Sequence, residues 1–146
     1  MTDCIPVVLF TYKRRDVLER TLACLHENHV PLIIACSDAS KNERDQQGVA
    51  SVRDLLSGID WCEVERHDRT ENWGLGRNVL AGVSEALERF ESVLVWEDDL
   101  ICVPGTYNYL CSALRAYRNA SRVMSVTGWT NRHLIPADVE DHPYFD

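Results

Sequence analysis

The sequence lacks both an excess of basic residues and any long apolar run. It has 15 Lys and Arg against 23 Asp and Glu, and its formal charge is −8. Because binding to nucleic-acid phosphates needs a basic face, this balance argues against a nucleic-acid partner and suits a bound divalent cation better. No apolar stretch approaches the ~20 residues of a membrane span, so we expect no transmembrane segment. The chain has an acid, Asp3, where a secretory signal carries basic residues, and both features favour a cytoplasmic protein.

The six cysteines also lack C-x-x-C spacing. Cys4 and Cys36 border or lie in apolar, strand-like runs, whereas Cys24 and Cys111 lie in helical patterns. Such settings are typical of buried thiols that pack as small apolar side chains. We therefore predict thiols rather than disulfides, as in a reducing compartment.

Short apolar runs alternate with amphipathic helical patterns along a chain whose 146 residues fit one domain, here taken as residues 1–146. The predicted strands cover residues 6–12, 32–36, 62–67, 92–96 and 122–129, and the third of them alternates weakly enough to suggest a sheet edge. The helical patterns cover residues 17–25, 49–59, 75–87 and 107–117. This alternation predicts an α/β fold with a mostly parallel sheet and helices on both faces.

Three consecutive carboxylates, Glu97, Asp98 and Asp99, follow the apolar run 92–96. A buried strand that ends in three like charges carries a repulsion that folding alone does not require. Ligands of open α/β sheets bind beyond the carboxyl ends of the strands. Hard oxygen ligands at such a position suit Mn²⁺ or Mg²⁺. The alternative is a solvated acidic loop, which is common after strands of α/β proteins.

The segment ENWGLGRNVLAGV, residues 71–83, places Gly74 and Gly76 at the start of a predicted helix, with Arg77 in the same turn. Backbone N–H groups and the helix dipole favour an anion at such a start. The segment is not a dinucleotide-binding fingerprint, because Val79 stands where G-x-G-x-x-G requires its last glycine. The alternative is a helix with a glycine-rich entry.

Four segments in this order, VVLFTYKRRDVLERTL, SDAS, ENWGLGRNVLAG and VLVWEDDLICVPGTYNYL, resemble the nucleotide-binding half of a GT-A glycosyltransferase. They are most similar to the family 2 and N-acetylglucosaminyltransferase I types, whose metal motif is also E-D-D. The resemblance spans nearly all of residues 5–130. It implies a Rossmann-like fold that binds a nucleotide-diphospho-sugar, most often a UDP-sugar, through Mn²⁺ or Mg²⁺. It also implies a carbohydrate or glycan acceptor.

The resemblance further implies which residues bind the nucleotide. Thr11 and Arg14 match positions that wrap the base after the first strand, and Asp38 matches the acid that accepts from the uracil ring N–H. The residues expected against the diphosphate are Asn72, Gly74 and Arg77.

The resemblance implies a separate role for each acid of the motif. Its last acid ligates the metal, which makes Asp99 the expected metal residue. Asp98 would then lie near the ribose hydroxyls, and Glu97 near the donor sugar.

The catalytic base is not identified. The carboxylates available after the fifth predicted strand, none of them in a recognisable motif, are Asp138, Glu140, Asp141 and Asp146. We therefore expect a domain truncated before its acceptor-binding part. One alternative is a non-catalytic nucleotide-sugar-binding module, which the missing base favours. Another is a sugar nucleotidyltransferase, although such enzymes carry a glycine-rich basic loop after the first strand and FTYKRRD has no glycine.

Overall fold

The computed structural model describes residues 4–129. Its elements are β1 (Val7–Thr11), α1 (Arg15–Glu27), β2 (Leu32–Ser37), α2 (Glu43–Ser57), β3 (Glu63–Asp68), α3 (Leu75–Leu87), β4 (Leu94–Glu97) and α4 (Thr106–Tyr117). The chain divides into two compact units, the first ending at Pro104 and the second beginning at Gly105. The first unit contains the whole sheet, and α4 belongs to the second.

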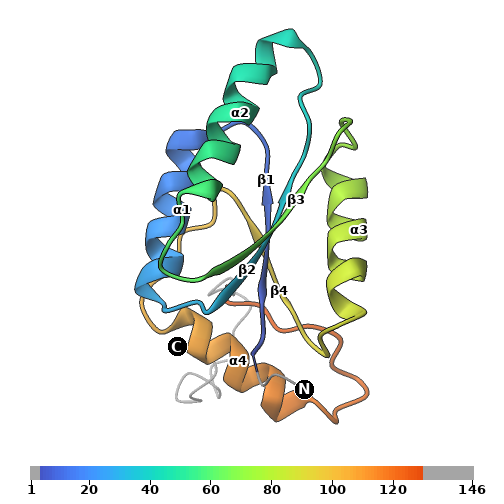
Figure 1. The fold of residues 1–146 in the computed structure, drawn as a ribbon. Coiled ribbons are helices and arrows are strands. Elements are labelled where there is room, and N and C mark those ends of the chain that lie inside the picture. Colours follow the sequence, from blue (N-terminus) through green and yellow to red (C-terminus); the bar gives the residue numbers. More distant parts are fainter. Residues whose placement is uncertain (1–3, 130–146) are drawn as a thin grey trace. The chain divides into compact units, whose positions relative to one another are not determined.

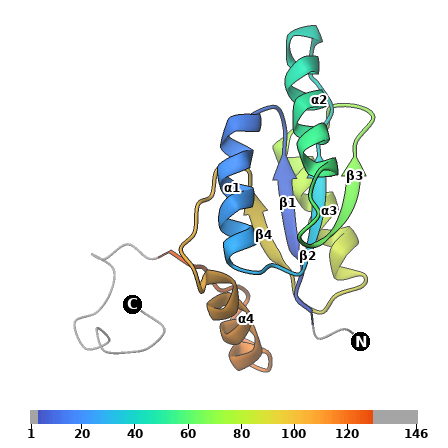
Figure 2. The same ribbon diagram turned by 60° about the vertical axis from the view of Figure 1, so that its left-hand side comes forward.

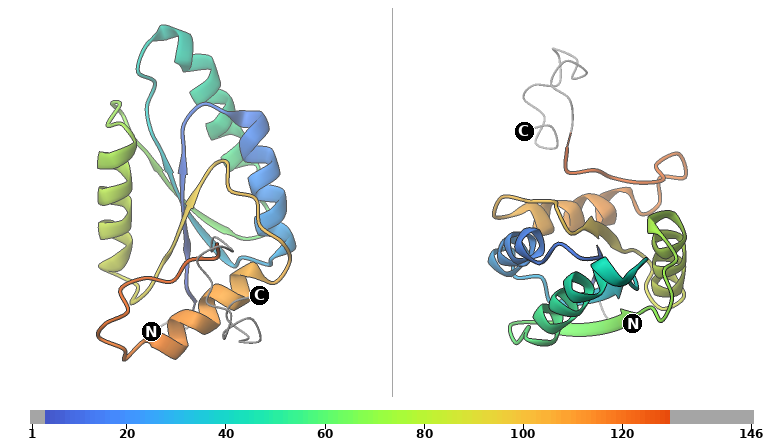
Figure 3. Two further views of the ribbon diagram at one scale, coloured as in Figure 1. Left: turned by 180° about the vertical axis from the view of Figure 1, so that it is seen from behind. Right: turned by 90° about the horizontal axis from the view of Figure 1, so that it is seen from above.

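The first unit is a four-stranded sheet with helices on both faces. The strand order is β3-β2-β1-β4, and every pairing is parallel (Figure 2). Helices α1 and α2 cover one face and α3 covers the other (Figures 1 and 3). The predicted α/β class is therefore confirmed.

Burial explains the order of the strands. All residues of β1 and β2 are buried, in keeping with the continuous apolar runs of central parallel strands. The sequence of β3, EVERHD, is only partly buried, and β3 lies at the edge of the sheet as predicted. A core cluster under α3 joins the two central strands through Phe10 and Cys36, with Ala86 of the helix packed on them.

Helix α3 approaches the sheet closely at Gly82. A Cβ atom at this position would lie 2.7 Å from the Cys36 sulfur and 2.9 Å from Phe10 Cε1. A larger residue would push the helix off the strands, because neither contact atom belongs to a mobile side-chain end. The glycine thus seats α3 on the central strands β1 and β2.

The prediction of a fifth strand over residues 122–129 is wrong, because these residues of the second unit form neither strand nor helix. Met124 is 97% exposed and Trp129 is 74% exposed. Apolar and β-branched residues favour a strand only where a neighbouring strand and a covering surface are available to them. The run therefore has strand composition without strand structure.

Candidate functional site

A cavity of about 460 Å³ opens in the first unit at the carboxyl ends of the strands. The strand order reverses between β1 and β4, since the chain proceeds from β1 outward to β3 and then returns to the other side of β1. Open α/β sheets bind their ligands at such a switch point. Seven of the nine predicted site residues line this cavity: Thr11, Arg14, Asp38, Asn72, Gly74, Glu97 and Asp98. The other two, Arg77 and Asp99, are not among its lining residues.

Thr11 ends β1 with a buried hydroxyl at the cavity. The residue is 4% exposed, and its Oγ1 is the one buried side-chain oxygen or nitrogen in residues 4–129 that has no hydrogen-bond partner. Leaving such a group unpaired costs roughly 1–3 kcal/mol. A polar ligand atom in the cavity would remove that cost.

Arg14 binds both aspartates of the acidic motif. Its Nη2 donates to Asp98 Oδ1 and, over 3.0 Å, to Asp99 Oδ2. The hydrogen bond to Asp98, reinforced by the charge of Asp98 and by Asp99, raises the pKa of the Arg14 guanidinium. A cation of the chain itself thus offsets the repulsion between the carboxylates.

The same carboxylate oxygens fit a divalent cation. In residues 4–129, no three His, Cys, Asp or Glu side chains come together as a metal-binding group. Mg²⁺ commonly takes only one or two protein carboxylates and completes its shell with substrate phosphates and water. Asp98 and Asp99 provide two such carboxylates. The Asp98 side chain is buried, that of Asp99 is 44% exposed, and the Arg14 guanidinium already binds both.

Asp38 follows β2 and holds the turn that leads into α3. Its Oδ1 accepts from the backbone N–H groups of Ala39 and Trp73, each over 2.9 Å. Its Oδ2 accepts from the Asn72 side-chain amide over 3.1 Å and from the Gly74 N–H over 2.8 Å. An ionised carboxylate offers about four lone-pair sites, so these four donors fill them. Asp38 therefore fixes the position of Gly74, whose φ of 73° suits glycine.

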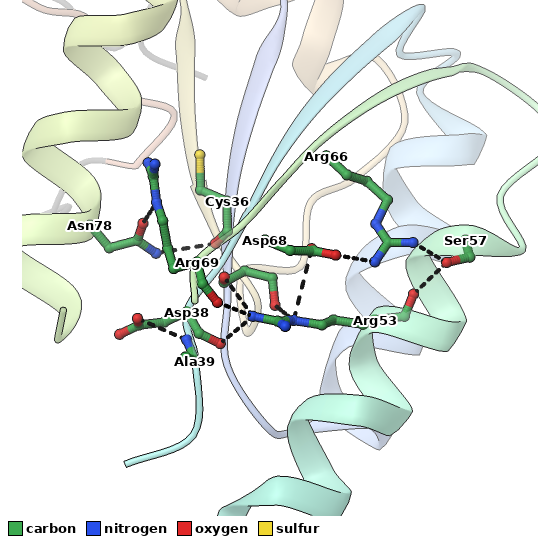
Figure 4. A network of polar contacts seen from close by, with 10 residues as sticks. Cys36, Asp38, Ala39, Arg53, Ser57, Arg66, Asp68, Arg69 and Asn78 are labelled. Atoms are coloured by element: carbon green, nitrogen blue, oxygen red, sulfur yellow. Dashed lines mark hydrogen bonds and ion pairs between the residues drawn. The ribbon is translucent and has the colours of Figure 1, made fainter. Parts of the chain in front are cut away.

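Arg53 of α2 ties the ends of β2 and β3 together beneath this turn (Figure 4). Its Nη2 donates to the carbonyls of Ser37, Asp38 and Arg69 over 3.3, 3.4 and 2.8 Å. The Ser37 carbonyl also accepts from the Arg69 backbone N–H over 2.9 Å, and a planar guanidinium can bind several carbonyls at once. Sequence reasoning missed Arg53, since a single arginine in an amphipathic helix carries no distinguishing signal.

Arg77 packs on Trp73. Its guanidinium carbon lies 4.3 Å from the Trp73 ring centroid, and that of Arg69 lies 4.2 Å from the same ring. Such contacts are favourable cation–π interactions. Arg77 therefore contacts the turn that Asp38 holds, and its predicted role at the diphosphate remains a proposal.

A polar stripe on α1 holds the loop that follows the acidic motif. Thr21 Oγ1 donates to the Asp98 carbonyl over 2.7 Å, and Asn28 Nδ2 donates to the Val103 carbonyl over 3.1 Å. Cys24 lies between these positions in sequence, one helical turn beyond Thr21. The three-residue spacing places Thr21 and Cys24 on one face of α1, and Asn28 is the C-cap residue directly after the helix. Sequence reasoning missed this stripe. The signal that could have found it is the presence of polar residues on the apolar face of a predicted helix.

The fold and the cavity at its switch point define a small α/β domain with a Rossmann-like sheet of the kind found in glycosyltransferases. The chain is similar to a solved structure of the mannosyltransferase PcManGT from Pyrobaculum calidifontis in complex with GDP-Man and Mn²⁺, with a TM-score of 0.54. The sequence identity is 17%, and the match covers 73% of this chain and 31% of that chain. The chain therefore spans less than a third of the protein it matches.

The sequence comparisons add nothing to this likeness, because no protein-family model and no curated protein matches the sequence.

None of the helices in residues 4–129 is long and apolar enough to cross a bilayer.

Proposed function

We propose that this chain is the nucleotide-sugar-binding domain of a metal-dependent glycosyltransferase. The observation that carries the proposal is the cavity at the switch point, which Asp98 lines and Asp99 directly follows, with both carboxylates bound to the Arg14 guanidinium. The unpartnered hydroxyl of Thr11 in the same cavity supports it. The fold's likeness to a glycosyltransferase supports it as well.

The start of α3 supports the binding of a diphosphate. The first N–H groups of a helix have no partner within it, and the helix dipole attracts an anion there. The first turn of α3 carries no acidic residue, and a Cβ atom built on Gly76 would meet nothing within 4 Å. The Asp38 carboxylate already binds the N–H of Gly74, the residue before the helix, so a diphosphate would bind the N–H groups that follow, beside the open space at Gly76.

The chemistry of sugar transfer gives each group a task. A bound divalent ion would act as a Lewis acid that stabilises the charge of the departing nucleoside diphosphate. Asp99, with Asp98 beside it, would hold that ion, and Glu97 would lie near the donor sugar. The candidate bases Asp138, Glu140, Asp141 and Asp146 lie outside the described residues, so no base is assigned. The acceptor, a carbohydrate or glycan, is likewise part of the proposal.

The base of the nucleotide is proposed to be uracil. The mannosyltransferase is bound to GDP-Man, so the two nucleotides need a direct comparison. Asp38 can accept the uracil N–H only after one of its four present donors leaves. Titration calorimetry with UDP and with GDP, each with Mn²⁺, would decide between the bases; tighter binding of GDP would contradict the uracil assignment.

The metal assignment is tested by repeating the UDP titration with a chelator and with two variants. We expect Asp99→Asn to remove most of the metal dependence. Asp60→Asn is the matched control, because Asp60 is an exposed acid that precedes β3 and so lies at the opposite end of the strands. Equal UDP affinity with Mn²⁺ and with chelator would contradict the proposal.

A turnover assay separates the enzyme classes. Release of sugar from a UDP-sugar, by transfer or by hydrolysis, with Mn²⁺ supports a glycosyltransferase. Release of pyrophosphate from UTP and a sugar phosphate would instead identify a nucleotidyltransferase. Metal-dependent binding with neither activity would identify a nucleotide-sugar-binding module.

A further inference from the structure

We propose that Cys24 and Cys102 form a reversible intramolecular disulfide that fastens the loop after the acidic motif to α1. The two sulfur atoms lie 3.4 Å apart although 78 residues separate them in sequence. Cys24 belongs to α1, and Cys102 comes three residues after Asp99, in a segment that is neither helix nor strand. A sulfur–sulfur bond measures about 2.05 Å, so a small movement of this irregular segment closes the gap.

Hydrogen bonds from neighbouring groups hold both sulfur atoms in place. The Cys102 backbone N–H donates to Cys24 Sγ over 3.4 Å, and Asn28 Nδ2 donates to Cys102 Sγ over 3.3 Å. Cys24 Sγ in turn donates to the Thr21 carbonyl over 3.1 Å. These contacts keep the two sulfur atoms side by side, in position for disulfide exchange.

An oxidant can reach the pair through an open groove of about 710 Å³. Cys24 and Cys102 both line it, together with the polar side chains of Arg20, His26, Glu27 and His29. Cys102 is half-buried and Cys24 is 6% exposed, so Cys102 is the thiol that meets the oxidant first.

Other cysteines provide a contrast within the same chain. Burial raises the pKa of the Cys36 thiol to about 11, and it raises that of the half-buried Cys62 thiol to about 11 as well. A thiol with a raised pKa carries little thiolate near neutral pH. Cys62, half-buried like Cys102, is thus the matched control for exposure alone.

The reaction requires a small disulfide as oxidant, such as oxidised glutathione. The Cys102 thiolate attacks one sulfur of the oxidant, whose S–S bond breaks and releases one glutathione thiolate. The Cys24 thiolate then attacks Cys102 Sγ, breaks the mixed disulfide and releases the second glutathione. Two protein thiols are oxidised and one small disulfide is reduced to two thiols, so electrons and atoms balance.

The bond would act on the segment that carries the acidic motif. Thr21 already binds the carbonyl of Asp98, and Cys24 Sγ lies 3.8 Å from the Leu100 carbonyl. A covalent link three residues beyond Asp99 would hold this segment against α1. The consequence for metal binding rests on the proposed function, whereas formation of the bond does not.

The test treats the reduced 146-residue chain with oxidised glutathione and then maps the linked peptides by mass spectrometry. We expect the thiol count to fall by two from the six cysteines of the sequence, with Cys24 joined to Cys102. Addition of dithiothreitol should restore all six. A link between other cysteines, or a glutathione adduct on Cys102 that Cys24 does not displace, would overturn the proposal.

Variants and thermal unfolding complete the test. Cys102→Ser and Cys24→Ser should each abolish the loss of two thiols, and Cys62→Ser should leave it unchanged. Linkage in the wild-type chain is decisive even if the buried Cys24→Ser variant does not fold. The oxidised wild type should unfold several degrees higher than the reduced form, because a cross-link across 78 residues restricts the unfolded chain. An equal or lower Tm would show that the fold does not accommodate the bond.

Discussion

The Arg14 guanidinium lies 3.0 Å from the Asp99 carboxylate and also binds Asp98, so a cation of the chain itself occupies the acidic motif. This pair explains how the half-buried strand β4 can end in consecutive carboxylates. It also means that Arg14 and a divalent ion compete for the same oxygen atoms. Nucleotide phosphates would relieve this competition, because they offer Arg14 other partners.

Replacing Arg14 by Ala should therefore increase the affinity for Mn²⁺ measured without nucleotide. The pair is about half exposed on the arginine side, which limits its strength to roughly 1 kcal/mol, or about fivefold in affinity. Electron paramagnetic resonance of unbound Mn²⁺ measures this affinity directly. Arg15→Ala is the control, because Arg15 has the same charge but contacts Glu19 and Ser51 instead. Unchanged or weaker Mn²⁺ binding by Arg14→Ala would contradict the competition.

Asp38→Asn should destabilise the fold, because an amide group would face two N–H donors that now meet a carboxylate oxygen. Leaving buried donors unpaired costs about 2–3 kcal/mol in the free energy of unfolding, measurable by urea titration. Asp60→Asn, outside the site, should unfold like the wild type. If Asp38 acts by holding the turn, UDP, GDP and plain diphosphate should all bind more weakly. Selective loss of UDP binding in a normally stable variant would indicate a base contact instead.

The sequence predicted the elements better than the contacts between them. Continuous apolar runs and regular helical spacing are local properties, so β1, β2 and the four helices followed from them. The four donors on Asp38 come from residues up to 36 positions away, and no local pattern records that they meet. Nor could the pattern show that Cys24, which resembles any buried thiol, contacts Cys102. The failed strand at 122–129 has the same cause, since its composition did not specify a partner.

Thr11→Val should change the stability of the fold and the affinity for the nucleotide in opposite directions. Valine has nearly the shape of threonine and suits a strand, and it removes a buried hydroxyl that has no partner in the described part of the chain. We expect the free energy of unfolding to rise by about 1 kcal/mol and the affinity for the nucleotide to fall. Thr21→Val is the matched control, because the Thr21 hydroxyl donates to the Asp98 carbonyl over 2.7 Å. That variant should lose roughly 1 kcal/mol of stability, and equal effects of the two substitutions would contradict the assignment of Thr11.

Acid should weaken the contact between β3 and α3. His67 lies 2.9 Å from Glu65 and 2.9 Å from Glu85, one carboxylate at each ring nitrogen. The hydrogen bond from Arg89, and then that from His67, lowers the pKa of Glu65. At Glu85, desolvation acts to raise the pKa, but the hydrogen bonds from Arg69 and His67 outweigh it and the pKa is lowered.

The sign of the pH dependence follows from these directions. A carboxylate whose pKa is lower in the folded than in the unfolded state stabilises the fold above the unfolded value, 4.5 for glutamate. That stability is lost as the pH falls through the folded value. We therefore expect the free energy of unfolding by urea to decrease between pH 5 and pH 3, a window below the ordinary histidine range. Glu85→Gln should lessen the decrease by roughly 0.5–1 kcal/mol, since the pair is partly solvent-exposed. Glu88→Gln, an exposed position on the adjoining turn, should keep the full decrease, and parallel curves for all three proteins would exclude Glu85 as a source of the acid sensitivity.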